Sequence, residues 1–178
     1  MMISSFQTKS ILGAAGWHLA DSNAPPTPYD HFVRCLGFSL QRRTLIDPPA
    51  SSVGFDMNAI EAGTEYELRR ALYELFLEAF ESEVCYAICV NFGEWTFTPK
   101  DLKITSHFEP FPVSVTPYAE YVVFGNSDFS HGVFGNPLNS HLVVFGNLFV
   151  ERFSRLLLRT HRLVIAQVAA RSWNGDQA

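Results

Sequence analysis

Apolar residues in the segment 65–82 recur at steps of three and four, the spacing that places them on one face of a helix. Thr64 and Glu67 stand at the spacing of a capping box, in which two side chains satisfy free backbone amides at a helix start. A second apolar face of helical period starts near Asn147, a residue type that serves well as an N-cap. The pattern therefore predicts two main helices, over residues 65–82 and 148–165.

Several short apolar runs have the composition of strands. Val84–Val90 is β-branched and aromatic, and Trp95–Thr98 alternates apolar with polar residues, so we expect a hairpin that turns near residues 91–93. Gly and Asn adopt backbone angles that most other residues avoid, and they favour turns at strand ends. The chain carries three further apolar runs that end in Phe-Gly-Asn, at residues 124–126, 134–136 and 145–147. These runs predict an antiparallel meander.

The remaining segments show no clear hydrophobic periodicity. We expect an extended lead-in over 1–28, a short helix over 29–36, a loop over 43–55, an extended connection over 105–118 and a frayed tail over 171–178. The length suits one domain. We therefore predict a single α+β domain over residues 1–178, with an antiparallel sheet of about five or six strands packed against two main helices.

The composition is that of a folded domain without a membrane-spanning segment. Hydrophobic residues make up 47% and charged residues 17%, which is typical of a folded domain, and no apolar stretch reaches the roughly 18 residues of a membrane span. The net charge of −5 disfavours nucleic acid as the main partner. Cys35, Cys85 and Cys89 are an odd number, which favours reduced thiols and a cytoplasmic location. Cys85 and Cys89 are expected on one side of a strand as packing residues.

A stripe of arginines is the main electrostatic feature. Residues 148–171 carry five arginines and one glutamate, a charge of +4, so the rest of the chain carries −5 − 4 = −9. The stripe itself consists of Arg152, Arg155, Arg159 and Arg162. Such a face can bind phosphate or an acidic protein surface. The alternative, which we favour, is that these arginines pair with the glutamates of helix 65–82 or face water.

Histidines supply the candidate chemistry. His131 and His141 each follow a serine and open a strand, and Asp128 lies close to the first. If adjacent strands brought the histidines together, the pair could bind a metal or act as a general base. Turn chemistry explains the same pattern equally well. The sequence contains no Gly-x-Ser-x-Gly elbow, no phosphate-binding glycine loop and no His-Glu-x-x-His helix. We predict no metal and no cofactor. Glu94, beside Trp95, is expected to be solvated.

One set of motifs spans residues 119–124, 128–137 and 143–146, together with Val84–Pro99. These stretches resemble a family of small bacterial proteins of unknown function. The family's pattern is an extended aromatic strand, an aspartate, a Gly-x-Phe-Gly-x-Pro turn and a Val-Phe-Gly strand. Asn136 and Leu138 stand where that pattern has histidine and tryptophan. The resemblance implies an immunity or interaction role and no reaction.

The leading functional hypothesis is a non-enzymatic, cytoplasmic protein-binding domain that neutralises a toxin, since an acidic body suits a basic partner. The alternative hypothesis is a small metal-dependent or acid–base enzyme that uses His131, His141 and Asp128. A third hypothesis is a homo-oligomer joined through an exposed sheet edge.

Overall fold

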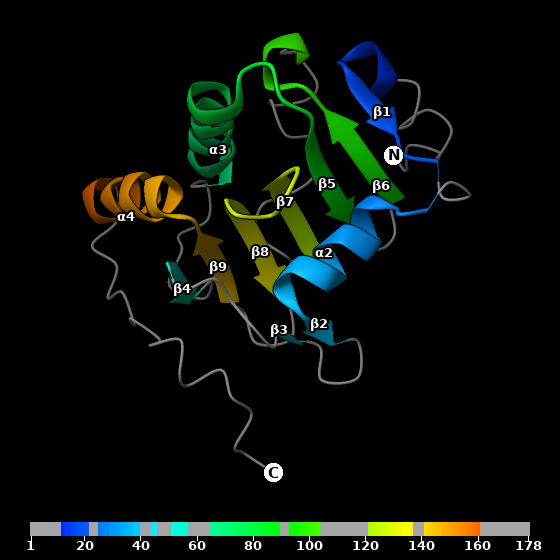
Figure 1. The fold of residues 1–178 in the computed structure, drawn as a ribbon. Helices are drawn as coiled ribbons and strands as arrows, with labels where there is room; N and C mark the ends of the chain where they lie inside the picture. The colour runs from blue at the N-terminus through cyan, green and yellow to red at the C-terminus, as the bar shows by residue number, and fades with distance from the viewer. Residues whose placement is uncertain are drawn as a thin grey trace, which may run out of the picture.

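A seven-stranded antiparallel sheet forms the centre of the protein in a computed structural model (Figure 1). The structure describes residues 12–21, 25–39, 44–45, 51–56, 65–89, 93–103, 121–136 and 141–160. The strands, in their order across the sheet, are β1 (Trp17–Leu19), β6 (Gly93–Phe97), β5 (Cys85–Cys89), β7 (Val122–Asn126), β8 (Gly132–Asn136), β9 (His141–Phe145) and β4 (Ser52–Asp56).

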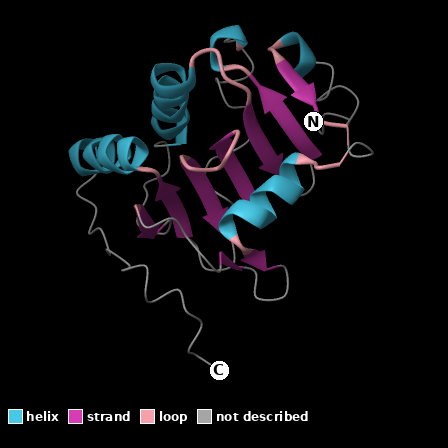
Figure 2. Ribbon diagram, in the orientation of Figure 1, coloured by secondary structure: helices cyan, strands magenta, loops and turns pink. Residues whose placement is uncertain are grey.

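Helices cover both faces of this sheet. The main helices are α2 (Pro28–Leu36), α3 (Glu65–Phe80) and α4 (Asn147–Thr160), and the short 3-10 helix η2 (Pro99–Asp101) follows β6. A small second sheet pairs β2 (Phe38–Ser39) with β3 (Thr44–Leu45). In Figure 2, α2 lies across the front of the sheet, whereas α3 and α4 lie together at its upper left. The side chains of α3 and α4 pack in a different core from those of α2.

Two hydrophobic cores result from the alternation of side chains along the strands. In β7, Val122 and Phe124 belong to the core under α3 and α4, whereas Val123 between them belongs to the core under α2. The same alternation places Val133 and Phe134 of β8 in different cores. Because successive strand residues point to opposite faces, a strand that is apolar at every position needs cover on both sides.

The predicted α+β class is confirmed, but the sheet has more strands than expected. The loop expected over residues 43–55 contains β3, which belongs to the small second sheet, and all of β4 except Asp56. β1 lies within the predicted lead-in. β1 has three residues and lies at one edge of the sheet, and β4 lies at the other edge. Such edge strands carry a weak sequence signal because their conformation depends on pairing with a neighbour that is distant in sequence.

The short helix α2 has clear local signals. Thr27 caps it: the Thr27 hydroxyl accepts from the Asp30 backbone N–H, and the Asp30 carboxylate accepts from the Thr27 backbone N–H. This confirms the helix expected over residues 29–36. Glu94 of β6 was expected to be solvated, but its carboxylate accepts a hydrogen bond of 2.9 Å from the backbone N–H of Tyr29. Burial, followed by the charges of Glu94 and Asp30, raises the pKa of the Tyr29 phenol.

The two long helices begin close to their predicted positions. α3 ends at Phe80, two residues before the expected end, and α4 begins at Asn147. Thr64 lies outside the described residues, as do the segments 105–118 and 171–178. Among the described helices, none combines the length and the apolar character that crossing a membrane requires.

Cys85 and Cys89 are both buried in the core under α3 and α4, which confirms that they share one side of β5. Burial, and to a lesser degree the charge of Glu83, raises the pKa of the Cys85 thiol to about 12. The thiol therefore stays neutral and acts as a small apolar group. Cys35, by contrast, is exposed.

Candidate functional site

The turn between β7 and β8 holds Asp128 and His131, two of the three residues predicted for chemistry. Asn126 closes this turn, and its side chain is only 5% exposed. The backbone N–H of Asn126 donates to the carbonyl of His131 at 3.1 Å. The backbone N–H of His131 donates to the side-chain Oδ1 of Asn126 at 3.0 Å. The buried amide therefore ties the two ends of the turn together.

Ser130 lies at the centre of the polar contacts in this turn. Its Oγ accepts a hydrogen bond of 3.0 Å from Nδ2 of Asn126 and lies 3.0 Å from Nδ1 of His131. Its backbone N–H donates to Oδ1 of Asp128 at 2.9 Å. Hydrogen bonding to the side chain and then to the backbone of Ser130 lowers the pKa of the Asp128 carboxyl. The aspartate therefore orders the turn around Ser130 and makes no described contact with the His131 ring.

The His131 ring is positioned by apolar neighbours from both long helices. Its centroid lies 5.6 Å from the ring of Phe80, at the end of α3, and 5.8 Å from the ring of Phe149, at the start of α4. The third neighbour is the backbone of Gly146, where an added Cβ would overlap the ring. The half-buried imidazole thus packs where α3, α4 and the β7–β8 turn meet.

Phe129 holds the opposite side of the turn. It has a φ of 54°, in the left-handed region, and its side chain is 1% exposed. The ring lies 5.7 Å from both Phe32 of α2 and Tyr86 of β5, and it occupies the space next to Gly125. Left-handed backbone costs about 1–2 kcal/mol, whereas burial of a large apolar side chain stabilises by about 1.5–3 kcal/mol. Burial therefore holds the turn in its conformation.

His141 does not join this site, so the expectation that the two histidines come together is wrong. The register pairs His141 with Asn136 and Gly132 with Phe145, which puts His131 and His141 at opposite ends of the β8–β9 pair. At about 3.4 Å per residue, their backbones are at least about 13 Å apart. The reason is geometric: residues that each open a strand lie at opposite ends of an antiparallel pair. Within the described ranges, no three His, Cys, Asp or Glu side chains gather as metal ligands.

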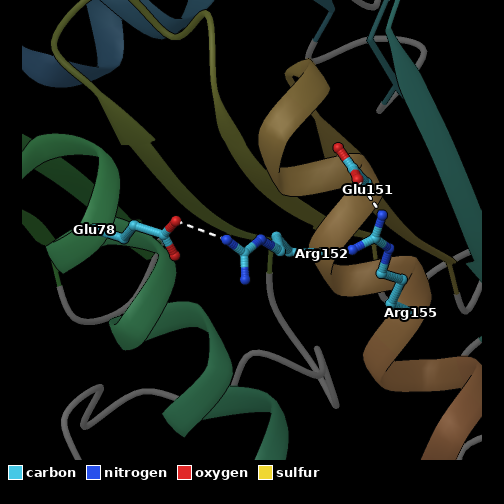
Figure 3. A network of polar contacts seen from close by, with 4 residues as sticks. All are labelled: Glu78, Glu151, Arg152 and Arg155. Carbon is cyan, nitrogen blue, oxygen red and sulfur yellow. Dashed lines mark hydrogen bonds and ion pairs between the residues drawn. The ribbon is translucent and has the colours of Figure 1, made fainter.

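The arginine stripe forms ion pairs, as Figure 3 shows. Nη2 of Arg152 lies 2.8 Å from Oε1 of Glu78, which links α4 to α3, and Arg155 pairs with Glu151 one turn earlier on α4. The first pair is the one expected between this stripe and the glutamates of helix 65–82. All four side chains are about half exposed. The Arg159 side chain and Arg162 lie outside the described residues.

The polar roles of Asn126 and Ser130 were missed in the sequence, although a signal for them exists. Asn126, Asp128 and Ser130 alternate along the turn, and Asn, Asp and Ser are the residues whose short polar side chains bond nearby backbone. The Phe-Gly-Asn pattern by itself predicts only that Asn126 ends a strand. The contact between Asn126 and Ser130 joins residues four apart through their side chains, and turn propensity alone does not indicate it.

The fold and the turn define a three-layer α+β domain with an antiparallel sheet, whose polar cluster lies where two helices meet the end of the sheet. The chain belongs to the family described as "Protein of unknown function (DUF2716)", whose model matches residues 24–150. This match contains α2, α3 and the β7–β8 turn, and it ends before Arg152. It confirms the resemblance to a protein family of unknown function that the sequence motifs predicted.

A second comparison finds a relative in Bacillus subtilis (strain 168). The chain is 30% identical over 91 residues to the protein named "Uncharacterized protein YxiI". The aligned part is 51% of this chain and 56% of the relative, so the chain spans about half the length of the relative that it matches. No solved structure matches the chain.

Proposed function

We propose that this domain is a non-enzymatic, cytoplasmic protein-binding domain with a basic protein as its partner, and that a toxin is the specific form of that partner. The charge distribution supports the proposal, since residues outside 148–171 sum to −9 in a chain of net charge −5. Complementary charge raises association rates and selects among partners.

The observation that carries the proposal is the acidic C-terminal half of α3 and the segment after it. Glu74, Glu78, Glu81 and Glu83 are all exposed, and the last turn of α3 holds no basic residue. Negative charge near a helix C-terminus is unfavourable by about 0.3–1 kcal/mol, because the helix dipole is negative at that end.

Ion pairing offsets only part of this unfavourable charge. Glu78 is compensated by Arg152, and Glu74 by Arg70 at 2.9 Å. Glu81 and Glu83 have no ion-pair partner among the residues that the structure describes. These two carboxylates do not stabilise the fold through a cation, so we assign their charge to recognition of a basic partner.

The test compares the wild-type chain with two double variants. In Glu81→Lys/Glu83→Lys the local charge is reversed, and in Glu81→Gln/Glu83→Gln it is only removed. Each purified chain is immobilised and exposed to lysate of its source cells at about 50 and 300 mM salt, and captured proteins are identified and then purified for kinetics. Salt in this range shortens the Debye length, so an electrostatic complex weakens.

We expect the wild type to capture a basic protein at low salt. The association rate should fall at least tenfold in the Lys variant and less in the Gln variant, with dissociation little changed. Circular dichroism verifies that all three chains are folded. Absence of any partner at low salt would sink the proposal, as would equal association rates in all three chains. Light scattering of the same samples tests the homo-oligomer hypothesis.

A further inference from the structure

Ser130 differs from an ordinary turn serine in its neighbours. It is exposed, and its Oγ lies 3.0 Å from an imidazole nitrogen, Nδ1 of His131. The same oxygen accepts a hydrogen bond of 3.0 Å from Nδ2 of the buried Asn126 side chain. A hydroxyl within hydrogen-bond reach of a base is the pairing by which a general base activates a serine nucleophile, and here the hydrogen bond from Asn126 serves to hold the serine side chain in place.

We propose that Ser130 and His131 form a nucleophile–base pair that accepts acyl groups from small activated esters and passes them to water. This property does not rest on the proposed protein-binding function; with it, the domain would combine protein binding with ester hydrolysis and would no longer be non-enzymatic. It also replaces the predicted pair of His131 with His141, since the sheet register keeps His141 at the other end of β8 and β9.

The reaction needs only ester and water. With the ring proton on Nε2 of His131, Nδ1 accepts the Oγ proton while Oγ bonds to the carbonyl carbon of the ester. The bond from that carbon to the alcohol oxygen then breaks, and the imidazolium returns the proton to the departing alcohol. Water attacks the acyl-serine ester in the same way, which releases the acid and restores Ser130.

The surroundings fix both groups before any ligand arrives. Phe80 and Phe149 hold the His131 ring, and the absence of a side chain at Gly146 leaves room for it. The hydrogen bond from the backbone N–H of Ser130 to Asp128 fixes the serine backbone. Orientation matters because proton transfer by a positioned group contributes about 10²–10⁴-fold to a rate.

The test uses the purified full chain and two probes, a fluorophosphonate and p-nitrophenyl acetate. A fluorophosphonate leaves a stable adduct on the attacking oxygen, so peptide mass spectrometry identifies the modified residue. We expect one adduct per chain, on Ser130, and hydrolysis of p-nitrophenyl acetate above that of free imidazole at equal concentration. Ser130→Ala should lose both.

The remaining variants separate an activated serine from an exposed one. His131→Phe keeps an aromatic ring against Phe80 and Phe149 but removes the base, and it should slow labelling of Ser130 at least tenfold. Ser127→Ala changes the exposed serine at the other end of the turn and should leave labelling within twofold of wild type. Urea titration verifies that each variant is folded. Either an unlabelled Ser130 in the wild type or an equal labelling rate in His131→Phe would overturn the proposal.

Discussion

The imidazole ring of His131 occupies the space that a side chain at position 146 would need. Gly146 also has a φ of +88°, which L-residues rarely adopt. Gly125 is related to Phe129 in the same way, since a Cβ there would overlap the Phe129 ring. Two of the three Phe-Gly-Asn glycines therefore make room for the two rings of one turn. They shape the site around the β7–β8 turn and do not repeat a binding unit.

Replacement of Gly146 by alanine should destabilise the protein. The new methyl group would displace the His131 ring, and the backbone would remain in the left-handed region, so we expect a loss of about 1–3 kcal/mol in the free energy of unfolding. Urea denaturation at pH 7 measures it. Gly13→Ala is the matched control, because Gly13 is exposed with no atom within 4 Å of an added Cβ. A loss at Gly146 no larger than that at Gly13 would contradict the packing of His131 against the glycine.

The contribution of Asp128 to stability should depend on pH. Because the pKa of Asp128 is lowered in the folded chain, its carboxylate stabilises the fold above its unfolded pKa, and this stability is lost as the pH falls through the folded pKa. We expect Asp128→Ala to cost about 0.5 kcal/mol at pH 7, a small value because solvent screens an exposed carboxylate.

Urea titrations of wild type and Asp128→Ala at pH 7, and at progressively lower pH below 4, test this prediction. The difference between the two chains should shrink as the pH falls. Asp128→Asn keeps the acceptor oxygen without the charge, so it should lie between them at pH 7. A difference that stays constant across the titration would show that the ionised carboxylate does not stabilise the turn.

The ion pair between Arg152 and Glu78 should stabilise the contact of α4 with α3 only slightly. Both side chains are about half exposed, so a double-mutant cycle with alanine should give a coupling energy of about 0.2–1 kcal/mol. Added salt of about 0.5 M should reduce it by screening. The control is the same double-mutant cycle on Arg155 and Glu151, which form an ion pair within α4 and do not link two helices. A coupling above about 2 kcal/mol, insensitive to salt, would be inconsistent with an exposed pair.

Thiol reactivity should distinguish Cys35 from the other cysteines. Cys35 is exposed, whereas Cys85 and Cys89 are buried, and the pKa of Cys85 is raised to about 12. Titration with a disulfide reagent at pH 8 should therefore modify one thiol in the folded chain and all three in guanidinium chloride. Cys35→Ser should abolish the reaction of the folded chain. Reaction of all three thiols at one rate without denaturant would contradict the burial of β5.

Local patterns in the sequence determined the elements with strong periodicity. The stripe of apolar residues in 65–82 and the run Val84–Val90 became α3 and β5, because hydrophobic period and side-chain propensity act over neighbouring residues. The Phe-Gly-Asn runs became β7, β8 and β9 for the same reason. The sequence also located the turn that carries Asp128 and His131.

Only the tertiary structure decided which residues meet. The register of β8 and β9 placed His141 away from His131 and Gly146 beside it. The packing of α3 on the sheet brought Phe80 to the same ring. β1 and β4 became strands because the edges of the sheet offered them unpaired backbone groups, which no local pattern reports. Side-chain contacts depend on pairing and packing over the whole chain, whereas helix and strand preferences depend on residues next to one another.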